Sequence, residues 1–184
     1  MLPRGMGPTP LLRSVLLGLA LLELSSLGCA GKAHHEATKG YDVAKSATYA
    51  WATEDLVMIG VGEPQPQVRT EANERRLRAA IDASLTEHGY AKAAPADADL
   101  IVAFSVGTRV RYRLEGGENS YIASLQPGEK QTKAALHIYL LHRGDQIEAW
   151  HGWTSKWLTR GDDPDTVVRE AVGQIMAELP ARKR

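Results

Sequence analysis

Residues 100–113 constrain the fold more than any other part of this sequence. Their first half, Leu-Ile-Val-Ala-Phe-Ser, is apolar at even and at odd positions, whereas the second half alternates apolar residues with Arg109, Arg111 and Arg113. A strand that is apolar on both faces is typical of the covered centre of a sheet. The pattern therefore predicts a central strand whose second half extends past the core into solvent.

The segments around this strand supply the rest of a two-layer fold. Period-two patterns predict strands at 47–51, 134–141 and 146–155, and apolar stripes at helical spacing predict helices at 69–88 and 164–179. Three consecutive strands at hairpin-like spacing imply an antiparallel sheet. We therefore expect an α+β fold in the order β-α-β-β-β-α, with both helices packed on one face of a small antiparallel sheet.

Other local signals mark helix ends, loops and surface pairs. Asp163 and Pro164 suit the N-cap and the first position of the second helix. Residues 60–66, rich in Gly and Pro, and the polar residues 115–130 are predicted to be loops. Glu74 and Arg78, four residues apart on the first helix, are expected to pair on its outer surface.

The only cysteine of the sequence, Cys29, follows a segment with the properties of an export signal. Residues 1–13 carry Arg4 and Arg13 and no acid, and residues 14–22 form an uncharged apolar run. That run is too short for the ~20 residues of a membrane-spanning helix but suits a signal peptide. Residues 1–28 are therefore interpreted as a signal peptide, and a single cysteine excludes an internal disulfide.

The residues that end at Cys29 point to a lipid anchor. Residues 26–29 read Ser-Leu-Gly-Cys and resemble the bacterial lipobox, which implies acylation of Cys29; the alternative is an ordinary signal peptide with a chance cysteine. Ala30, where inner-membrane lipoproteins carry Asp, implies the outer membrane, facing the periplasm. Residues 29–40 are expected to form the lipidated cysteine and a flexible tether, followed by a single α+β domain over 41–184.

Short motifs distributed along this domain occur in an order and at a spacing that resemble a known family. They are Tyr41-Asp42, Thr48-Tyr-Ala-Trp51, His88-Gly-Tyr90, Ala98-Asp-Leu-Ile-Val-Ala-Phe104 with Gly107-Thr108, Trp150-x-Gly152-Trp153, and Leu179-Pro180. The sequence is similar, over about residues 41–180, to the bacterial family catalogued as domain of unknown function 4136. The resemblance implies an exported lipoprotein with an α+β domain and implies no activity.

Charge and motif content narrow the classes of function. Lys plus Arg and Asp plus Glu both number 22, so the chain lacks the basic surface expected of a nucleic-acid binder. Phosphate-binding, dinucleotide-binding, zinc-protease and serine-hydrolase motifs are absent from the sequence. We therefore expect no enzymatic activity and no cofactor, and an uncharacterised hydrolase remains the least favoured alternative.

Histidines offer a weak case for a metal or for acid–base chemistry. His34 and His35 are adjacent in the predicted tether, and His137 and His151 are placed across a predicted hairpin. Neither pair has a third ligand at a fixed spacing, so no metal site is predicted. Partly buried, hydrogen-bonded histidines are the preferred interpretation of the hairpin pair.

Two surfaces remain as candidate binding sites. Trp153 and Trp157, which alternation places opposite the core residue Trp150, suit an interface with a protein partner of the cell envelope. Arg109, Arg111 and Arg113 suit a small anionic or lipid ligand, or simply a solvated strand end. The leading hypothesis is a non-enzymatic binding or interaction module that reaches the membrane through its lipid anchor, and the arginine-lined anion site is the alternative.

Overall fold

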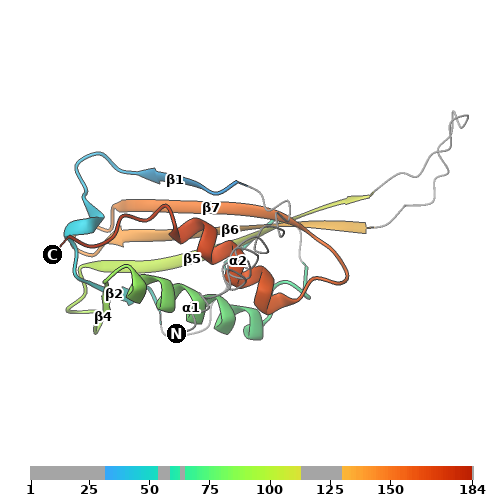
Figure 1. The fold of residues 1–184 in the computed structure, drawn as a ribbon, viewed down its shortest axis with the longest axis horizontal. Coiled ribbons are helices and arrows are strands. Elements are labelled where there is room, and N and C mark those ends of the chain that lie inside the picture. The colour runs from blue at the N-terminus through green and yellow to red at the C-terminus, as the bar shows by residue number, and fades with distance from the viewer. Residues whose placement is uncertain (1–31, 54–58, 63–64, 113–129, 184) are drawn as a thin grey trace, which may run out of the picture.

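The computed structural model describes residues 32–53, 59–62, 65–112 and 130–183. Within these residues the chain forms one seven-stranded sheet, and both α-helices lie on the same face of it (Figure 1). This arrangement confirms the predicted two-layer α+β fold. The predicted signal peptide, Cys29 and the predicted loop up to residue 129 lie outside the described residues.

The elements follow one another from an edge strand to a C-terminal helix. In chain order they are β1 (His34–Ala37), a short 3₁₀ turn (Val43–Lys45), β2 (Thr48–Trp51), β3 (Ile59–Gly62), α1 (Glu71–Glu87), β4 (Ala91–Lys92), β5 (Leu100–Tyr112), β6 (Lys130–His142), β7 (Glu148–Leu158) and α2 (Pro164–Met176). The two helices and the strands β2, β5, β6 and β7 correspond to the predicted elements.

The sheet is mixed, which corrects the expectation of an antiparallel one. β5, β6 and β7 are antiparallel neighbours as predicted, but β2 and β3 pair in parallel along one edge of β5, and β4 pairs in parallel with β2. The parallel pairs arise because α1 carries the chain back across the sheet between β3 and β5, and a strand–helix–strand crossover returns parallel.

Three short strands, β1, β3 and β4, lie where the sequence predicts none. β3 occupies part of the predicted loop 60–66, and β1 lies within the predicted tether 29–40, where it pairs antiparallel with β7 from His34 opposite Trp153 to Ala37 opposite Trp150. All four residues of β1 are exposed. Backbone hydrogen bonds rather than a buried side-chain face hold this strand, so the tether prediction is wrong for residues 34–37.

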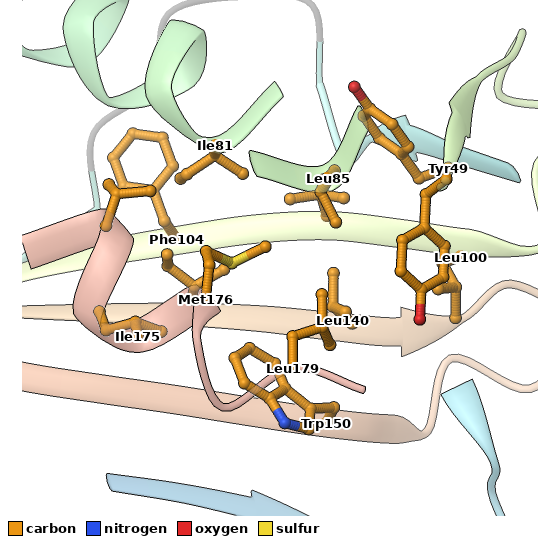
Figure 2. Close-up of a cluster of buried hydrophobic side chains, with 14 of the residues drawn as sticks. Tyr49, Ile81, Leu85, Leu100, Phe104, Leu140, Trp150, Ile175, Met176 and Leu179 are labelled. Atoms are coloured by element: carbon orange, nitrogen blue, oxygen red, sulfur yellow. The ribbon is translucent and has the colours of Figure 1, made fainter. Parts of the chain in front are cut away.

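The hydrophobic core lies between the helices and the even-numbered side chains of β5 and β6. Figure 2 shows Ile81 and Leu85 of α1 beside Met176 of α2, over Leu140 of β6. These four side chains are at most 1% exposed. Gly89 follows α1 with φ +90°, the left-handed conformation that commonly ends a helix.

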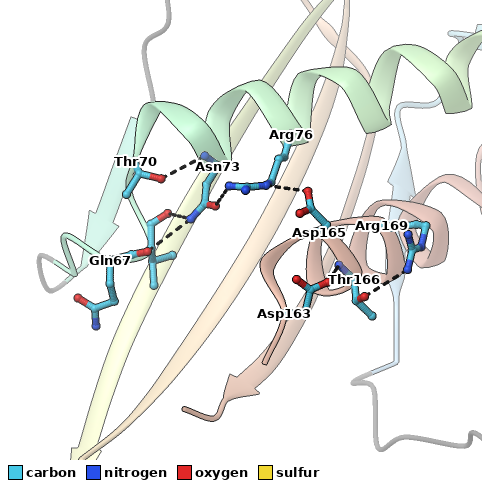
Figure 3. Close-up of polar contacts among 9 residues, drawn as sticks. Gln67, Thr70, Asn73, Arg76, Asp163, Asp165, Thr166 and Arg169 are labelled. Atoms are coloured by element: carbon cyan, nitrogen blue, oxygen red, sulfur yellow. Dashed lines mark hydrogen bonds and ion pairs between the residues drawn. The ribbon is translucent and has the colours of Figure 1, made fainter. Parts of the chain in front are cut away.

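Polar contacts fix the beginnings of both helices beside each other (Figure 3). The hydroxyl of Thr70 accepts a hydrogen bond from the backbone N–H of Asn73, and Asp163 caps α2 through Thr166, as predicted. Arg76 then donates to Asp165 at 2.7 Å, which links the two helices.

Glu74 is a second correction, because it is buried rather than on the outer surface. Its side chain lies 3.3 Å from Arg78, which donates a hydrogen bond to the carbonyl of Thr53 and covers the ring of Trp51 at 4.8 Å.

No helix in the described part of the chain is long and apolar enough to cross a membrane.

Candidate functional site

The sheet face opposite the helices carries a continuous group of aromatic and histidine side chains. Odd-numbered residues of β6 and β7 point to this face because successive side chains of a strand alternate. Both described helices cover the other face (Figure 1). We call this group the aromatic face; it consists of His34, His137, Tyr139, His151 and Trp153.

The rings of the aromatic face stack on one another across three strands. Tyr139 and His151, directly opposite each other on β6 and β7, have centroids 4.4 Å apart and planes tilted by 16°. Trp153 lies 4.8 Å from His151 and 5.5 Å from His34 of β1. Except for the exposed His34, these side chains are half-buried. The stacking holds the rings in one arrangement before any ligand binds.

A hydrogen-bonded pair of histidines lies at the centre of this face. Nδ1 of His137 and Nε2 of His151 are 3.0 Å apart, so one nitrogen donates a proton and the other accepts it. On its other side, His151 Nδ1 lies 3.8 Å from a carboxylate oxygen of Glu148. Burial, and then the charge of His151, lower the pKa of His137 below its ordinary value of 6.5.

The lowered pKa of His137 predicts an acid-sensitive fold. As the pH falls below 6.5 the unfolded chain binds a proton at His137 that the folded chain does not, so the free energy of unfolding decreases until the lower folded pKa is reached. For one proton the slope is at most about 1.4 kcal/mol per pH unit. Urea unfolding at pH 7.5 and pH 5.5 measures the loss, and His137→Gln should reduce it; an equal loss in that variant contradicts the assignment.

Trp157, the second predicted interface residue, lies farther along the same face. It is half-buried, and the ammonium of Lys133 sits 5.9 Å from its ring. Lys133 in turn lies opposite the exposed Arg109 of β5. The side chain of Arg111 and all of Arg113 lie outside the described residues, so the three-arginine site stays a prediction.

The histidines of β1 separate onto opposite sides of the sheet. His34 stacks on Trp153, whereas His35 lies 3.4 Å from Glu178, just past the end of α2. No group of three His, Cys, Asp or Glu side chains within the described residues could hold a metal ion. The hydroxyl of Ser105 lies 3.5 Å from that of Tyr139, and the structure records no hydrogen bond from it to a histidine.

Sequence reasoning located most of this face but missed its extent. Alternation places His137, His151 and Trp153 on one face of the hairpin, as the structure has them. His34 was missed because β1 lacks any apolar alternation. In the sequence, His34 stands beside two further polar residues, His35 and Glu36, in a segment whose small and polar composition predicts a tether. Nothing else in the sequence indicates that it belongs to the aromatic face.

Comparison with known proteins gives a family and a fold. The family model described as "Domain of unknown function (DUF4136)" matches residues 33–181. No curated protein sequence matches this one.

Solved structures with a TM-score of 0.50 or more share the arrangement of the sheet and helices. A DUF4136 family protein from Bacteroides thetaiotaomicron superposes with a TM-score of 0.50 at 13% identity, over 81% of this chain and 95% of that one. A PDZ domain protein from Parabacteroides distasonis gives 0.54 at 16% identity, over 84% of this chain but only 36% of the other. The PelC dodecamer from Paraburkholderia phytofirmans gives 0.48 at 10% identity, over 83% and 99%.

Proposed function

We propose a function from the premise that this chain belongs to the DUF4136 family. In this proposal the chain is a binding module of the bacterial cell envelope, and its aromatic face docks a partner protein. The observation that carries the proposal is the stacked row of rings on the sheet face that no described helix covers. The family description assigns no activity, so the role is argued from this surface.

The composition of the aromatic face suits a protein interface. Trp and Tyr are enriched among the residues that dominate binding energy, and the rings of His34, His137 and His151 surround Trp153. Because the rings already stack on one another, binding costs little of their conformational freedom. A polar partner group can also hydrogen-bond to the imidazoles at the rim of the surface.

The proposed address is the periplasmic side of the outer membrane, through an acylated Cys29. β1 begins five residues after Cys29, so an extended link spans at most about 17 Å. The domain would therefore stay close to the bilayer. Two or more acyl chains are needed for stable anchoring, and this is what lipoprotein modification supplies.

An alkyne-tagged fatty acid fed to cells tests the anchor. The wild-type chain should incorporate the tag and fractionate with membranes, because the thiol of Cys29 is the acceptor. Cys29→Ala should lose the tag completely and shift toward the soluble fraction. Incorporation that survives Cys29→Ala, or a wild-type chain that is never tagged, contradicts the proposed anchor.

Chemical crosslinking in intact cells tests the docking proposal. A tagged wild-type chain should give a discrete protein adduct that disappears in Trp153→Ala, because that change removes the ring in contact with three neighbours of the face. Arg169→Ala on the outer side of α2 is the control and should keep the adduct. Absence of any protein adduct, with a normal amount of folded protein, contradicts the proposal.

A second candidate function is supported by the positive charges at the far end of the same sheet face. Arg109 lies directly opposite Lys133, so at least two cations face the same side of the sheet. Such a pair suits an anionic lipid headgroup or glycan. If this surface carries the function, replacing Arg109, Arg111 and Arg113 together with Ala should abolish binding to anionic vesicles, while Trp153→Ala should leave it unchanged.

A further inference from the structure

A cavity of about 830 Å³ lies on the helix side of the sheet, away from the aromatic face. It opens between the first turns of α1 and α2 and the part of β6 and β7 beneath them, where Figure 3 shows the two helices beginning side by side. Its volume falls within the range of about 300–1,000 Å³ typical of small-molecule sites.

The walls of this cavity are more apolar than polar, although polar side chains such as Gln67, Asn73 and Thr154 also line it. Its apolar lining includes Leu77, Val106, Leu136, Leu158, Val167 and Val168, and no aromatic side chain is among the described residues that line it. A flat aromatic ligand would be expected to find rings to stack on. Branched aliphatic side chains instead suit a flexible hydrocarbon chain, which gains binding energy in proportion to the apolar surface that it buries.

One end of the cavity reaches the surface and is lined by Asp162 as well as by two basic side chains. Lys156 and the exposed Arg160 both line it. Lys156 lies 3.5 Å from Glu170 and 3.9 Å from Asp162, whereas no described carboxylate lies within 4.0 Å of Arg160. Arg160 is therefore available to an anionic group at the end of a chain that enters the cavity.

We propose that this cavity binds one acyl chain, and that the carboxylate of a free fatty acid bound there lies at Arg160. The proposal goes beyond docking on the aromatic face and does not depend on it, since the two sites lie on opposite faces of the sheet. The acyl chain has two sources: a free fatty acid, or one uncharged acyl chain of the lipid on Cys29. The second is within consideration because β1 runs antiparallel to β7, so its N-terminal end points toward Ser155 and Leu158, which line the cavity.

Displacement of a fluorescent fatty acid by palmitate tests the site, with purified full-length chain carrying Cys29→Ala. Palmitate should bind, and each methylene removed from the competitor should weaken binding about 4-fold, because each buried methylene contributes about 0.8 kcal/mol.

Val167→Trp fills the cavity and should weaken binding at least about 10-fold. Arg169→Trp, on the same helix outside the cavity, should not. Arg160→Ser should weaken palmitate and leave its methyl ester unaffected.

The outcomes separate the two sources and can overturn the site. Probe binding by Cys29→Ala but not by the acylated wild type in lipid nanodiscs assigns the cavity to the protein's own acyl chain; binding by both assigns it to a free fatty acid. Absence of displacement at about 100 µM palmitate, or an affinity that does not change with chain length, overturns the proposal. The chain-length series needs no cavity mutation, so it decides the matter even if Val167→Trp fails to fold.

Discussion

Gly152→Ala is expected to lower the free energy of unfolding by about 3 kcal/mol, at the upper end of the usual cost of overpacking a core. A Cβ at this position would lie 2.4 Å from Cη2 of Trp150 and 2.5 Å from Cγ2 of Ile175. Both side chains are at most 1% exposed, and neither can move aside without displacing β7 or α2. The missing side chain is what lets the indole of Trp150 lie flat on its own strand beneath α2.

Urea unfolding of three further variants tests this explanation. Gly173→Ala on α2 is the matched control: a Cβ there meets nothing within 4 Å, so the change should stabilise the protein by about 0.5–1 kcal/mol through helix propensity. Gly152→Ala should cost less in a Trp150→Phe background than in the wild type, because the two sites are in contact. An unchanged unfolding midpoint for Gly152→Ala contradicts the packing of Trp150 across Gly152.

Trp153→Ala is expected to weaken binding of the partner protein about 30-fold, which corresponds to the 2 kcal/mol typical of an interface hot spot. The ring of Trp153 packs beside the rings of His34, His137 and His151. Its loss removes a large apolar surface and also the contacts that hold these three rings in place. Titration of the partner identified by crosslinking, by calorimetry or surface plasmon resonance, measures the change.

The stability of the variant must be measured alongside its affinity. Ile147→Ala is the matched control, because Ile147 is an exposed large apolar side chain (43%) that lies in the hairpin turn and takes no part in the aromatic face. It should bind as the wild type does. If Trp153→Ala remains folded and binds with undiminished affinity, the partner contacts some other surface.

The central part of the fold could be predicted from the sequence because side-chain patterns determine it. β5 is apolar on both faces in its first half, and α2 begins at Asp163 and Pro164 with unambiguous capping signals. β1, β3 and β4 could not be predicted, because they are two to four residues long and backbone pairing, not alternation, places them. Gly60 and Gly62 of β3 are typical of a loop.

Features of the candidate sites that follow from side-chain alternation along a strand could be predicted, whereas those that arise from tertiary packing could not. Period-two alternation separates the buried Trp150 from Trp153 and puts His137 and His151 beside Trp153. The burial of Glu74 was not predictable, because it depends on Arg78 and the carbonyl of Thr53, which lies 25 residues from Arg78. The cavity left no sequence signal at all, since it is a space between side chains of five separate segments.

Site-specific photo-crosslinking in living cells tests the docking proposal most directly. A photoreactive phenylalanine analogue at Tyr139 would lie within the aromatic face, and the same analogue at Ala83 would lie on the exposed side of α1. We expect a single protein adduct on illumination from position 139 and none from position 83. Adducts of equal yield from both positions, or from position 83 alone, would contradict the assignment of the aromatic face as the docking surface.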